Sequence, residues 1–379
     1  MALTTSQKAV DFITLHAHPA ALSTEHTANN GWLKVETLPG KGRGFVAKRD
    51  IPAGTVVYTA RPLAVAVSQE WIPETCAWCF AFSYPKKMRV KSTHTKNIMF
   101  CSSECSSSFY QQGYKHEAEL ILRCYHALDH VKTTSTTTFS LVDIIPTPPS
   151  KDCSDTQLAA WLDEAWSIVS ATAPSDTWTP DRGEKTMCRL IAACLARKQC
   201  QQENCLLSDV IGFEQLWEMQ CNELACVRAM LQEKVPLQLI EIMHLYLYLS
   251  SALAGILDCP HALFRAIYFR EAANSFGLWE MPHKSQDGMD QGVTDDQELL
   301  GWGIYPSAVY FNHACNANII KIRDGRNMRF IAKVDIASGQ EACISYGSVG
   351  ESVQERRARL LEHYHFWCEC TRCKTESSS

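Results

Sequence analysis

The sequence predicts an α+β fold in which a strand-rich core is interrupted by two inserts. Short β-branched runs separated by glycine and proline turns lie between residues 31 and 67, and the same pattern returns after residue 305, which is typical of strands. Cysteine, aromatic residues and lysine are concentrated between residues 76 and 116. Apolar residues at helical spacing fill most of residues 117–270, which predicts a long helical insert.

These changes of pattern divide the chain into six segments. The core is expected in two parts because its strand pattern stops at the first insert and resumes after the second. Strands are expected at Tyr305–Phe311, Ile319–Arg323, Met328–Ala332 and Ala342–Ser345, followed by a charged helix at Glu351–Tyr364. The six segments are the N-terminal segment 1–30, the first core part 31–75, the cysteine-rich insert 76–116, the helical insert 117–270, the second core part 271–350, and the C-terminal segment with its tail, 351–379.

Composition argues against several classes of function. The net charge of −5 disfavours a protein that binds nucleic acid directly through a basic field, although it suits a basic peptide substrate. Residues 1–30 lack the basic flank and apolar run of a signal peptide, so we expect the nucleus, the cytoplasm or both. The most apolar stretch, Leu237–Leu257, carries Glu241 and His244, which favours a core helix over a membrane span. We expect a monomer without membrane association.

The 18 cysteines form two clusters and a scattered remainder. In a chain that is not secreted, clustered cysteines indicate metal ligands more than disulfides. One cluster has the pairs Cys76-x2-Cys79 and Cys101-x3-Cys105, which suit a single tetrahedral zinc; buried free thiols are the alternative. The other cluster offers three thiols, one fewer than such a site needs, and spacing alone does not select a fourth. Its members are Cys368, Cys370 and Cys373.

Four segments together resemble the SET-domain protein lysine methyltransferases, in particular the short, fungal-like form of the SET-and-MYND group. Their joint order along the chain carries the resemblance more than any one of them does. A further stretch, ANSFGL (273–278), is similar to a segment near the cofactor in this family. The four segments are PGKGRGFVAKRDIPAGTVV (39–57), YPSAVYFNHACNANI (305–319, similar to the NHxCxPN motif), GQEACISYG (339–347, similar to GEELxISYG) and RRARLLEHYHFWCECTRC (356–373, similar to the post-SET segment).

The resemblance implies a fold, a reaction and a set of site residues. It implies a SET core interrupted by a MYND-like zinc insert and a helical insert, and closed by a zinc-binding post-SET segment in which Cys315 is the fourth ligand. The reaction would be transfer of a methyl group from S-adenosylmethionine to a protein lysine, with a histone tail as one candidate substrate. Tyr346 would supply the catalytic hydroxyl, and Phe276 and Tyr364 would line the lysine channel. The cofactor would be held by Lys41, Gly42, Arg43, Asn274, Asn312, His313 and Phe366.

The sequence departs from the family pattern in three places. Ala317 stands where NHxCxPN has its proline. The middle CxxC of the MYND module is missing: His116 remains, but Leu120 occupies the position of a following cysteine. We therefore expect one zinc in this insert and two in the whole chain. We also expect no C-terminal helical repeat domain after Cys373.

Six of these assignments have a structural alternative. Tyr346 and Phe276 could be core residues, and His313 a satisfied buried histidine. Lys41 and Arg43 could be exposed cations of a turn, and Asn274 a helix cap. The acidic segment Asp287–Glu298 could guide a basic peptide, although a solvated loop is the simpler interpretation.

Two other functions compete with methyl transfer. A catalytically silent SET-fold scaffold would bind partners through its zinc module, and a zinc-dependent transcription factor would need a basic recognition helix that the sequence lacks. Because Tyr346 and the Asn312–His313 pair are retained, the sequence favours the active enzyme over the scaffold.

Overall fold

The computed structural model describes residues 31–92, 95, 97–114, 116–131, 140–173, 178–202, 211–231, 236–281 and 297–377. The N-terminal segment 1–30 and most of the acidic segment 287–298 lie outside these residues. The described residues fall into two compact units. We call them the helical unit (within Leu63–Gly277 and Leu300–Ile304) and the strand-rich unit (within Ala21–Pro62, Leu278–Leu299 and Tyr305–Ser379).

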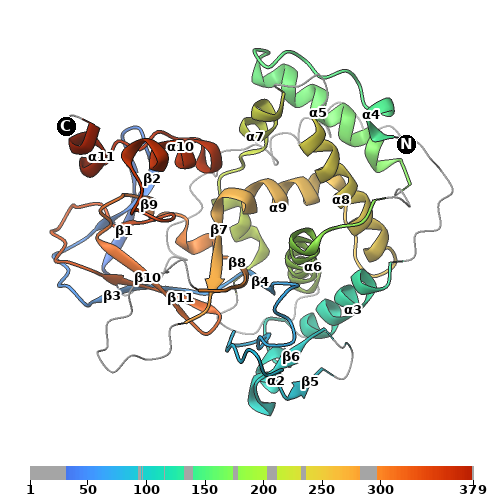
Figure 1. The fold of residues 1–379 in the computed structure, drawn as a ribbon, viewed down its shortest axis with the longest axis horizontal. Helices are drawn as coiled ribbons and strands as arrows, with labels where there is room; N and C mark the ends of the chain where they lie inside the picture. The colour runs from blue at the N-terminus through green and yellow to red at the C-terminus, as the bar shows by residue number, and fades with distance from the viewer. Residues whose placement is uncertain are drawn as a thin grey trace. The chain divides into compact units, whose positions relative to one another are not determined.

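The strand-rich unit joins the two ends of the chain. Strands β1 (Leu33–Leu38) and β2 (Gly42–Ala47) form an antiparallel hairpin. Strand β3 (Val56–Ala60) pairs with β11 (Asn327–Ala332), which also pairs with β10 (Ile319–Asp324). Figure 1 shows the result: blue β3, from the start of the chain, runs beside the orange strand β11. The mixed fold with strands from both ends of the chain agrees with the α+β class predicted from the sequence.

An aromatic core holds these strands together. Phe311 stacks on Phe330 of β11 with 4.2 Å between ring centroids, and Phe45 of β2 packs against Phe311 at 4.7 Å. Tyr58 of β3 completes the group at 5.6 Å from Phe45. All four residues are buried, so their packing fixes the position of Phe311 and of the residues that follow it.

The strand predicted at Tyr305–Phe311 is wrong. This stretch contains the 3-10 turn η3 (Pro306–Ala308), and the strand β9 is limited to Asn312–His313, paired in parallel with β12 (Cys343–Ile344). Pro306 has no backbone N–H to donate to a sheet and its fixed φ suits the first residue of a helical turn. The apolar residues that suggested a strand are buried within the turn instead.

The C-terminal segment contains two helices. Helix α10 (Val353–Tyr364) begins after Ser352, which forms a capping box with Glu355. This cap places the helix start two residues later than predicted. Its buried residues are Val353, Arg356 and Leu360, so an arginine lies on the apolar face of the helix. The short helix α11 (Thr371–Ser377) follows.

The helical unit contains the cysteine-rich insert, a bundle of helices, the strand β4 (Ala64–Val67) and most of the strands β7 (Ser275–Trp279) and β8 (Leu299–Ile304). These three strands form one sheet with β8 in the centre. The insert contains β5 (Val90–Lys91), β6 (Met99–Phe100) and α2 (Ser103–Tyr110). The bundle contains α3 (Glu117–Asp129), α4 (Leu141–Ile144), α5 (Asp155–Ser170), α6 (Arg182–Gln202), η2 (Phe213–Glu218), α7 (Glu223–Met230), α8 (Leu237–Leu253) and α9 (His261–Asn274).

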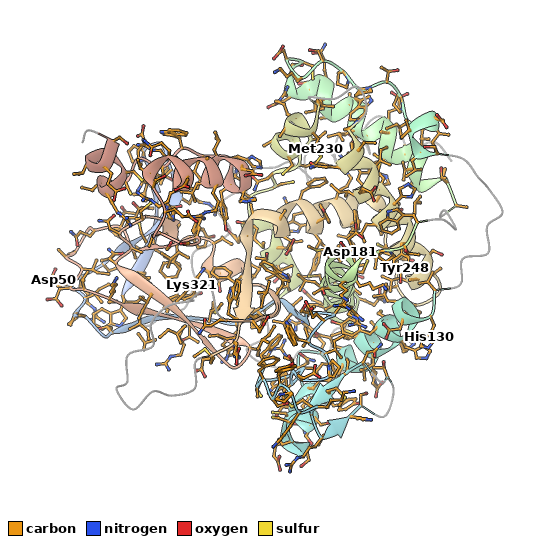
Figure 2. All side chains as sticks on the ribbon, in the orientation of Figure 1. Asp50, His130, Asp181, Met230, Tyr248 and Lys321 are labelled. Atoms are coloured by element: carbon orange, nitrogen blue, oxygen red, sulfur yellow. The ribbon has the colours of Figure 1, made fainter. Side chains whose placement is uncertain are left out.

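The apolar stretch that begins at Leu237 is a core helix, as the sequence predicted. Tyr248 of α8, labelled in Figure 2, donates a hydrogen bond from its hydroxyl to the carbonyl of Leu128 at 2.6 Å, which ties α8 to α3. Trp166 of α5 is fully buried and packs against Tyr246 of α8 at 5.7 Å. None of the described helices combines the length and apolar character that a membrane crossing requires.

A buried ion-pair network links three helices of the bundle. The Arg265 guanidinium on α9 donates to Glu223 of α7 at 2.7 Å and to Asp163 of α5 at 2.7 Å. The side chains of Arg265 and Glu223 are 1% and 0% exposed, so neither charge can recover hydration if its partner is lost. Each charge therefore depends on the other for its stability in the folded state.

We predict that Glu223→Gln destabilises the protein strongly, because it leaves the Arg265 charge buried with only the half-exposed Asp163 as a partner. Denaturant unfolding followed by circular dichroism should give a loss of about 3 kcal/mol. The matched control is Glu70→Gln, which removes an exposed pair with Arg182 and should cost less than about 1 kcal/mol. Equal losses in the two variants would contradict the assignment.

Candidate active site and zinc centres

Four rings from three separate parts of the sequence meet in the strand-rich unit. Tyr346, which follows β12, lies with its ring centroid 4.8 Å from that of Tyr364 at the end of α10. His313 of β9 lies 5.4 Å from Tyr346, and Phe366 lies 6.1 Å from His313. The structure therefore brings together four of the residues that the sequence singled out, and we call them the ring cluster.

Tyr346 is held at both its backbone and its side chain. Its hydroxyl donates a hydrogen bond to the carbonyl of Phe311 at 2.9 Å, and its backbone N–H donates to Nδ1 of His313 at 3.1 Å. The Tyr364 hydroxyl donates to the carbonyl of Tyr346 at 3.3 Å. Burial raises the pKa of Tyr346, so its phenol stays protonated at neutral pH. Because its proton is directed at Phe311, the lone pairs of its oxygen stay available to accept a hydrogen bond.

His313 joins the ring cluster to a cysteine. Burial, followed by the positive charges of Arg359 and Arg356, lowers the pKa of His313 to about 4, so the ring is neutral. Since Nδ1 accepts from the Tyr346 N–H, the ring proton is assigned to Nε2. Nε2 lies 3.3 Å from Sγ of Cys315. His313 thus satisfies both ring nitrogens inside the protein and connects Tyr346 to the thiol.

A carboxylate that the sequence analysis did not assign links two of the predicted cofactor residues. The Asn312 amide donates to Oε1 of Glu341 at 2.9 Å, and Lys41 forms an ion pair with Oε2 of the same carboxylate. Burial opposes the charge of Lys41, but the hydrogen bond and charge of Glu341 raise its pKa. Gly44 lies against this network: a Cβ there would be 2.5 Å from the Asn312 amide nitrogen. Glu341 therefore fixes Asn312 and Lys41, and position 44 has no room for a side chain.

Arg43 is directed toward a tyrosine. Its Nη1 donates to the Tyr310 hydroxyl at 3.2 Å, and its guanidinium carbon lies 4.9 Å from the centre of the Tyr310 ring. Gly42 has a φ of 73°, which favours glycine at this point of the β1–β2 turn. Arg43 is thus half-buried and partnered, whereas Lys41 is exposed.

Asn274 and Phe276 belong to the helical unit, so their predicted roles stay predictions. The Asn274 amide donates to the carbonyl of Arg270 at 2.8 Å and to that of Gln220 at 3.2 Å. Asn274 is the last residue of α9, and both bonds are made within the helical unit. Phe276 lies in β7 and is 8% exposed.

Four thiols meet beside the ring cluster. The sulfurs of Cys315, Cys368, Cys370 and Cys373 all lie within 4.8 Å of one another, and Cys315 is 3.5 Å from Cys373. Burial opposes ionisation of Cys370, but hydrogen bonds from backbone N–H groups lower its pKa to about 7. Four clustered thiolates with no open position fit a structural zinc ion. The set is the one that the sequence analysis proposed, with Cys315 as the fourth ligand.

The cysteine-rich insert contains a second group of four thiols. Cys76, Cys79, Cys101 and Cys105 also lie within 4.8 Å of one another, with 3.6 Å between Cys79 and Cys101. A hydrogen bond from Cys79 lowers the pKa of Cys76 to about 5. Within the part of the chain that the structure describes, these are the two groups of candidate ligands close enough to share a metal ion. The two structural zinc sites expected from the sequence are therefore supported.

The SET domain family model matches residues 42–347, which is most of the chain. The chain belongs to the SET-domain family. The match starts in β2 and ends just after Tyr346, so both inserts and Cys315 lie inside the SET domain, whereas Cys368, Cys370 and Cys373 lie beyond it. The α+β SET fold predicted from four short segments is confirmed.

Several curated relatives of this SET-domain protein carry the names of established or potential lysine methyltransferases. "Potential protein lysine methyltransferase SET6" of Saccharomyces cerevisiae is 28% identical over 373 residues, covering 89% of this chain and 94% of that protein. "N-lysine methyltransferase SMYD2-B" of Danio rerio is 23% identical over 342 residues, covering 89% of this chain and 59% of the Danio rerio protein. "Histone-lysine N-methyltransferase ASHR2" of Arabidopsis thaliana is 33% identical over 145 residues, covering 35% of this chain and 34% of that protein. These relatives support the predicted enzyme class.

Sequence analysis overlooked two charged residues of this SET domain and its post-SET segment. Glu341 lies inside the quoted GQEACISYG motif, and its place beside the NH motif became evident only from the fold. Arg356 had a sequence signal that was not used: it falls on the helical stripe formed by Val353 and Leu360, where an apolar residue would be expected.

We predict that purified protein contains two zinc ions per chain, because two complete four-thiol groups are present in the described residues. Elemental analysis is the measurement. Cys101→Ser and Cys370→Ser should each lower the content to about one zinc, since each removes one ligand of a different group. Cys153→Ser, outside both groups, should leave it unchanged. Three zinc ions, or none, in the unsubstituted protein would contradict this prediction.

Proposed function

We propose that this SET-domain protein transfers the methyl group of S-adenosylmethionine to the side-chain amine of a lysine in a protein substrate, with Tyr346 orienting that amine. One observation carries the proposal. The Tyr346 hydroxyl is anchored on the Phe311 carbonyl within the ring cluster, directly beside the Asn312–His313 pair.

The chemistry requires a neutral lysine in a fixed position. The reference pKa of lysine is about 10.4, so removing its proton near pH 7.4 costs roughly 4 kcal/mol. S-adenosylmethionine supplies the methyl group on a positively charged sulfur, and that charge favours the neutral form of a nearby amine. The protein is left with two tasks, which are to align the amine and to keep water away from it.

The ring cluster suits both tasks. Because the Tyr346 proton is donated to Phe311, its oxygen can accept a hydrogen bond from the amine and hold the nitrogen lone pair in one direction. The Tyr346 and Tyr364 rings pack together with the half-buried Phe366 nearby, so an amine beside them meets aromatic surface. We assign Tyr364 to the wall of the lysine channel and Phe366 to the adenine side of the cofactor.

The polar groups around Glu341 suit the amino-acid part of the cofactor. We assign Lys41 to its carboxylate, because a cation is the natural partner of that group. Asn312 would add a hydrogen bond, and Glu341 keeps both side chains in place. The neutral His313 would act by holding the backbone of Tyr346. Gly42 and Arg43 stay assigned to this region, although Arg43 is partnered by Tyr310.

We propose a lysine-bearing protein or peptide as the substrate, with a histone tail as one candidate, in the nucleus or the cytoplasm and with the enzyme as a monomer. The histone-lysine methyltransferase name of the Arabidopsis relative supports this candidate. The test is incubation with labelled S-adenosylmethionine and a mixture of core histones, followed by identification of the labelled lysine. If the protein were a silent scaffold, it would label neither histones nor peptides that carry lysine.

We predict that Tyr346→Phe lowers methyl transfer by about 100-fold or more, because it removes the oxygen that orients the amine. Calorimetric affinity for S-adenosylmethionine should change little, since the ring and its packing are retained. Tyr305→Phe is the matched control: it also removes a hydroxyl bonded to a carbonyl in this unit, that of Arg326 at 2.6 Å, and should leave transfer near the unsubstituted rate. If Tyr346→Phe kept full activity, the assignment of Tyr346 would be wrong.

A further inference from the structure

Arg356 is an arginine buried in the apolar face of a helix. It is 1% exposed and lies on α10 between Val353 and Leu360. Burying a guanidinium without partners would cost several kcal/mol. Its partners in the fold must therefore offset the loss of hydration.

The partners of Arg356 are two of the zinc-site cysteines, one carboxylate and one backbone carbonyl. Its Nε lies 3.3 Å from Sγ of Cys315, and its Nη2 lies 3.6 Å from Sγ of Cys373. Nη2 also donates to Glu376 of α11, and Nη1 donates to the carbonyl of Glu351. One guanidinium thus contacts the loop after β9, the start of α10 and helix α11.

Charge explains why an arginine is placed there. A zinc ion with four thiolates carries a net charge of two negative units, and three of these four cysteines are at most 5% exposed. We propose that Arg356 is a positioning residue of the C-terminal zinc site: it supplies the counter-charge for the buried thiolates and sets their affinity for zinc. A guanidinium suits this role because its fork of donors can contact two sulfurs at once.

The other zinc site provides an internal comparison. Both sites contain a thiol that receives hydrogen bonds from backbone N–H groups, Cys76 in the insert and Cys370 in the C-terminal site, so these bonds do not distinguish them. In the insert site Cys101 is exposed, so solvent can stabilise the charge of that site. The C-terminal site is more deeply buried and has a guanidinium against two of its sulfurs. Loss of Arg356 should therefore affect one of the two zinc ions only.

The neighbouring arginine provides a matched control. Arg357 donates from Nε to the carbonyl of Cys368 at 3.0 Å, and its guanidinium packs on the Trp367 ring at 5.0 Å. Arg357→Gln removes the same charge from the same helix at the adjacent position. Arg357 bonds to the backbone carbonyl of Cys368 and not to a sulfur. This variant should therefore leave the zinc affinity nearly unchanged.

The inference is tested by zinc competition on the full-length protein. A chromogenic chelator is titrated at fixed pH against the unsubstituted protein and against Arg356→Gln, Arg356→Lys and Arg357→Gln. Cysteines that become exposed are alkylated and mapped by mass spectrometry, which identifies the site that has lost its metal. Circular dichroism monitors the fold, and the zinc at Cys76, Cys79, Cys101 and Cys105 reports on the integrity of the rest of the chain.

We expect Arg356→Gln to weaken zinc binding at the C-terminal site by about 10- to 100-fold, the usual effect of losing a partner of metal ligands. Arg356→Lys should lose less, because it keeps the positive charge, and the insert zinc should be unaffected in every variant. Unchanged affinity in Arg356→Gln would overturn the proposal. The proposal would also be overturned if Arg357→Gln or Arg356→Lys lost as much zinc affinity at the C-terminal site as Arg356→Gln does. It would likewise be overturned if Arg356→Gln weakened zinc binding equally at both sites. None of these readouts depends on methyl transfer, so they distinguish this inference from the proposed function.

Discussion

The contact between Cys315 and the C-terminal thiols is the constraint on which the candidate site depends. Cys315 lies 53 residues before Cys368 and 58 before Cys373, yet their sulfurs are 4.0 Å and 3.5 Å apart. The segment that they hold includes α11, a helix of seven residues, which is too short to be stable alone in water. A zinc ion bound by these thiols would supply the free energy that orders this segment.

The same contact determines where the aromatic residues of the site lie. Cys315 follows His313 by two residues, and Cys368 follows Phe366 by two. The buried cysteines pack in one cluster with Tyr346, Tyr364 and Phe366, so we expect metal binding to be coupled to the assembly of the ring cluster. Tyr346 is then fixed from the other side by Phe311, whose ring belongs to the aromatic core of the strands. The site thus depends on a metal site on one side and on a hydrophobic core on the other.

Local patterns in the sequence predicted the features that depend on neighbouring residues. The four cysteines of the insert follow from spacing alone, because each pair lies within one short stretch of chain. Spacing does not predict Cys315 as a ligand, because its partners are distant in sequence. Only the family resemblance selected it. The pairing of β3 with β11 is likewise a long-range contact that periodicity cannot reveal. The strand predicted at Tyr305–Phe311 was wrong because it was inferred from apolar content alone. Pro306 has no backbone N–H to donate to a sheet, and the stretch forms a 3-10 turn instead.

Charged residues were the hardest to predict, because their roles depend on what the fold brings near them. The sequence indicated Lys41 as a cofactor residue, which stays a prediction, but it did not indicate the ion pair that Lys41 forms with Glu341. Arg356 was hidden in a helix described as charged, although its position on the apolar stripe marked it as buried. An arginine at a core position of an amphipathic helix is therefore a signal that a buried anion lies nearby.

Hydrogen exchange with and without zinc tests most directly whether the C-terminal metal site holds the candidate site together. The full-length protein would be compared before and after treatment with a chelator, and exchange would be followed in peptides by mass spectrometry. The account predicts that peptides covering residues 310–316, 343–349 and 364–373 gain exchange together, while the β10–β11 hairpin stays protected. If only residues 364–373 gained exchange and the other two segments stayed protected, the metal site would not be the constraint that assembles the ring cluster.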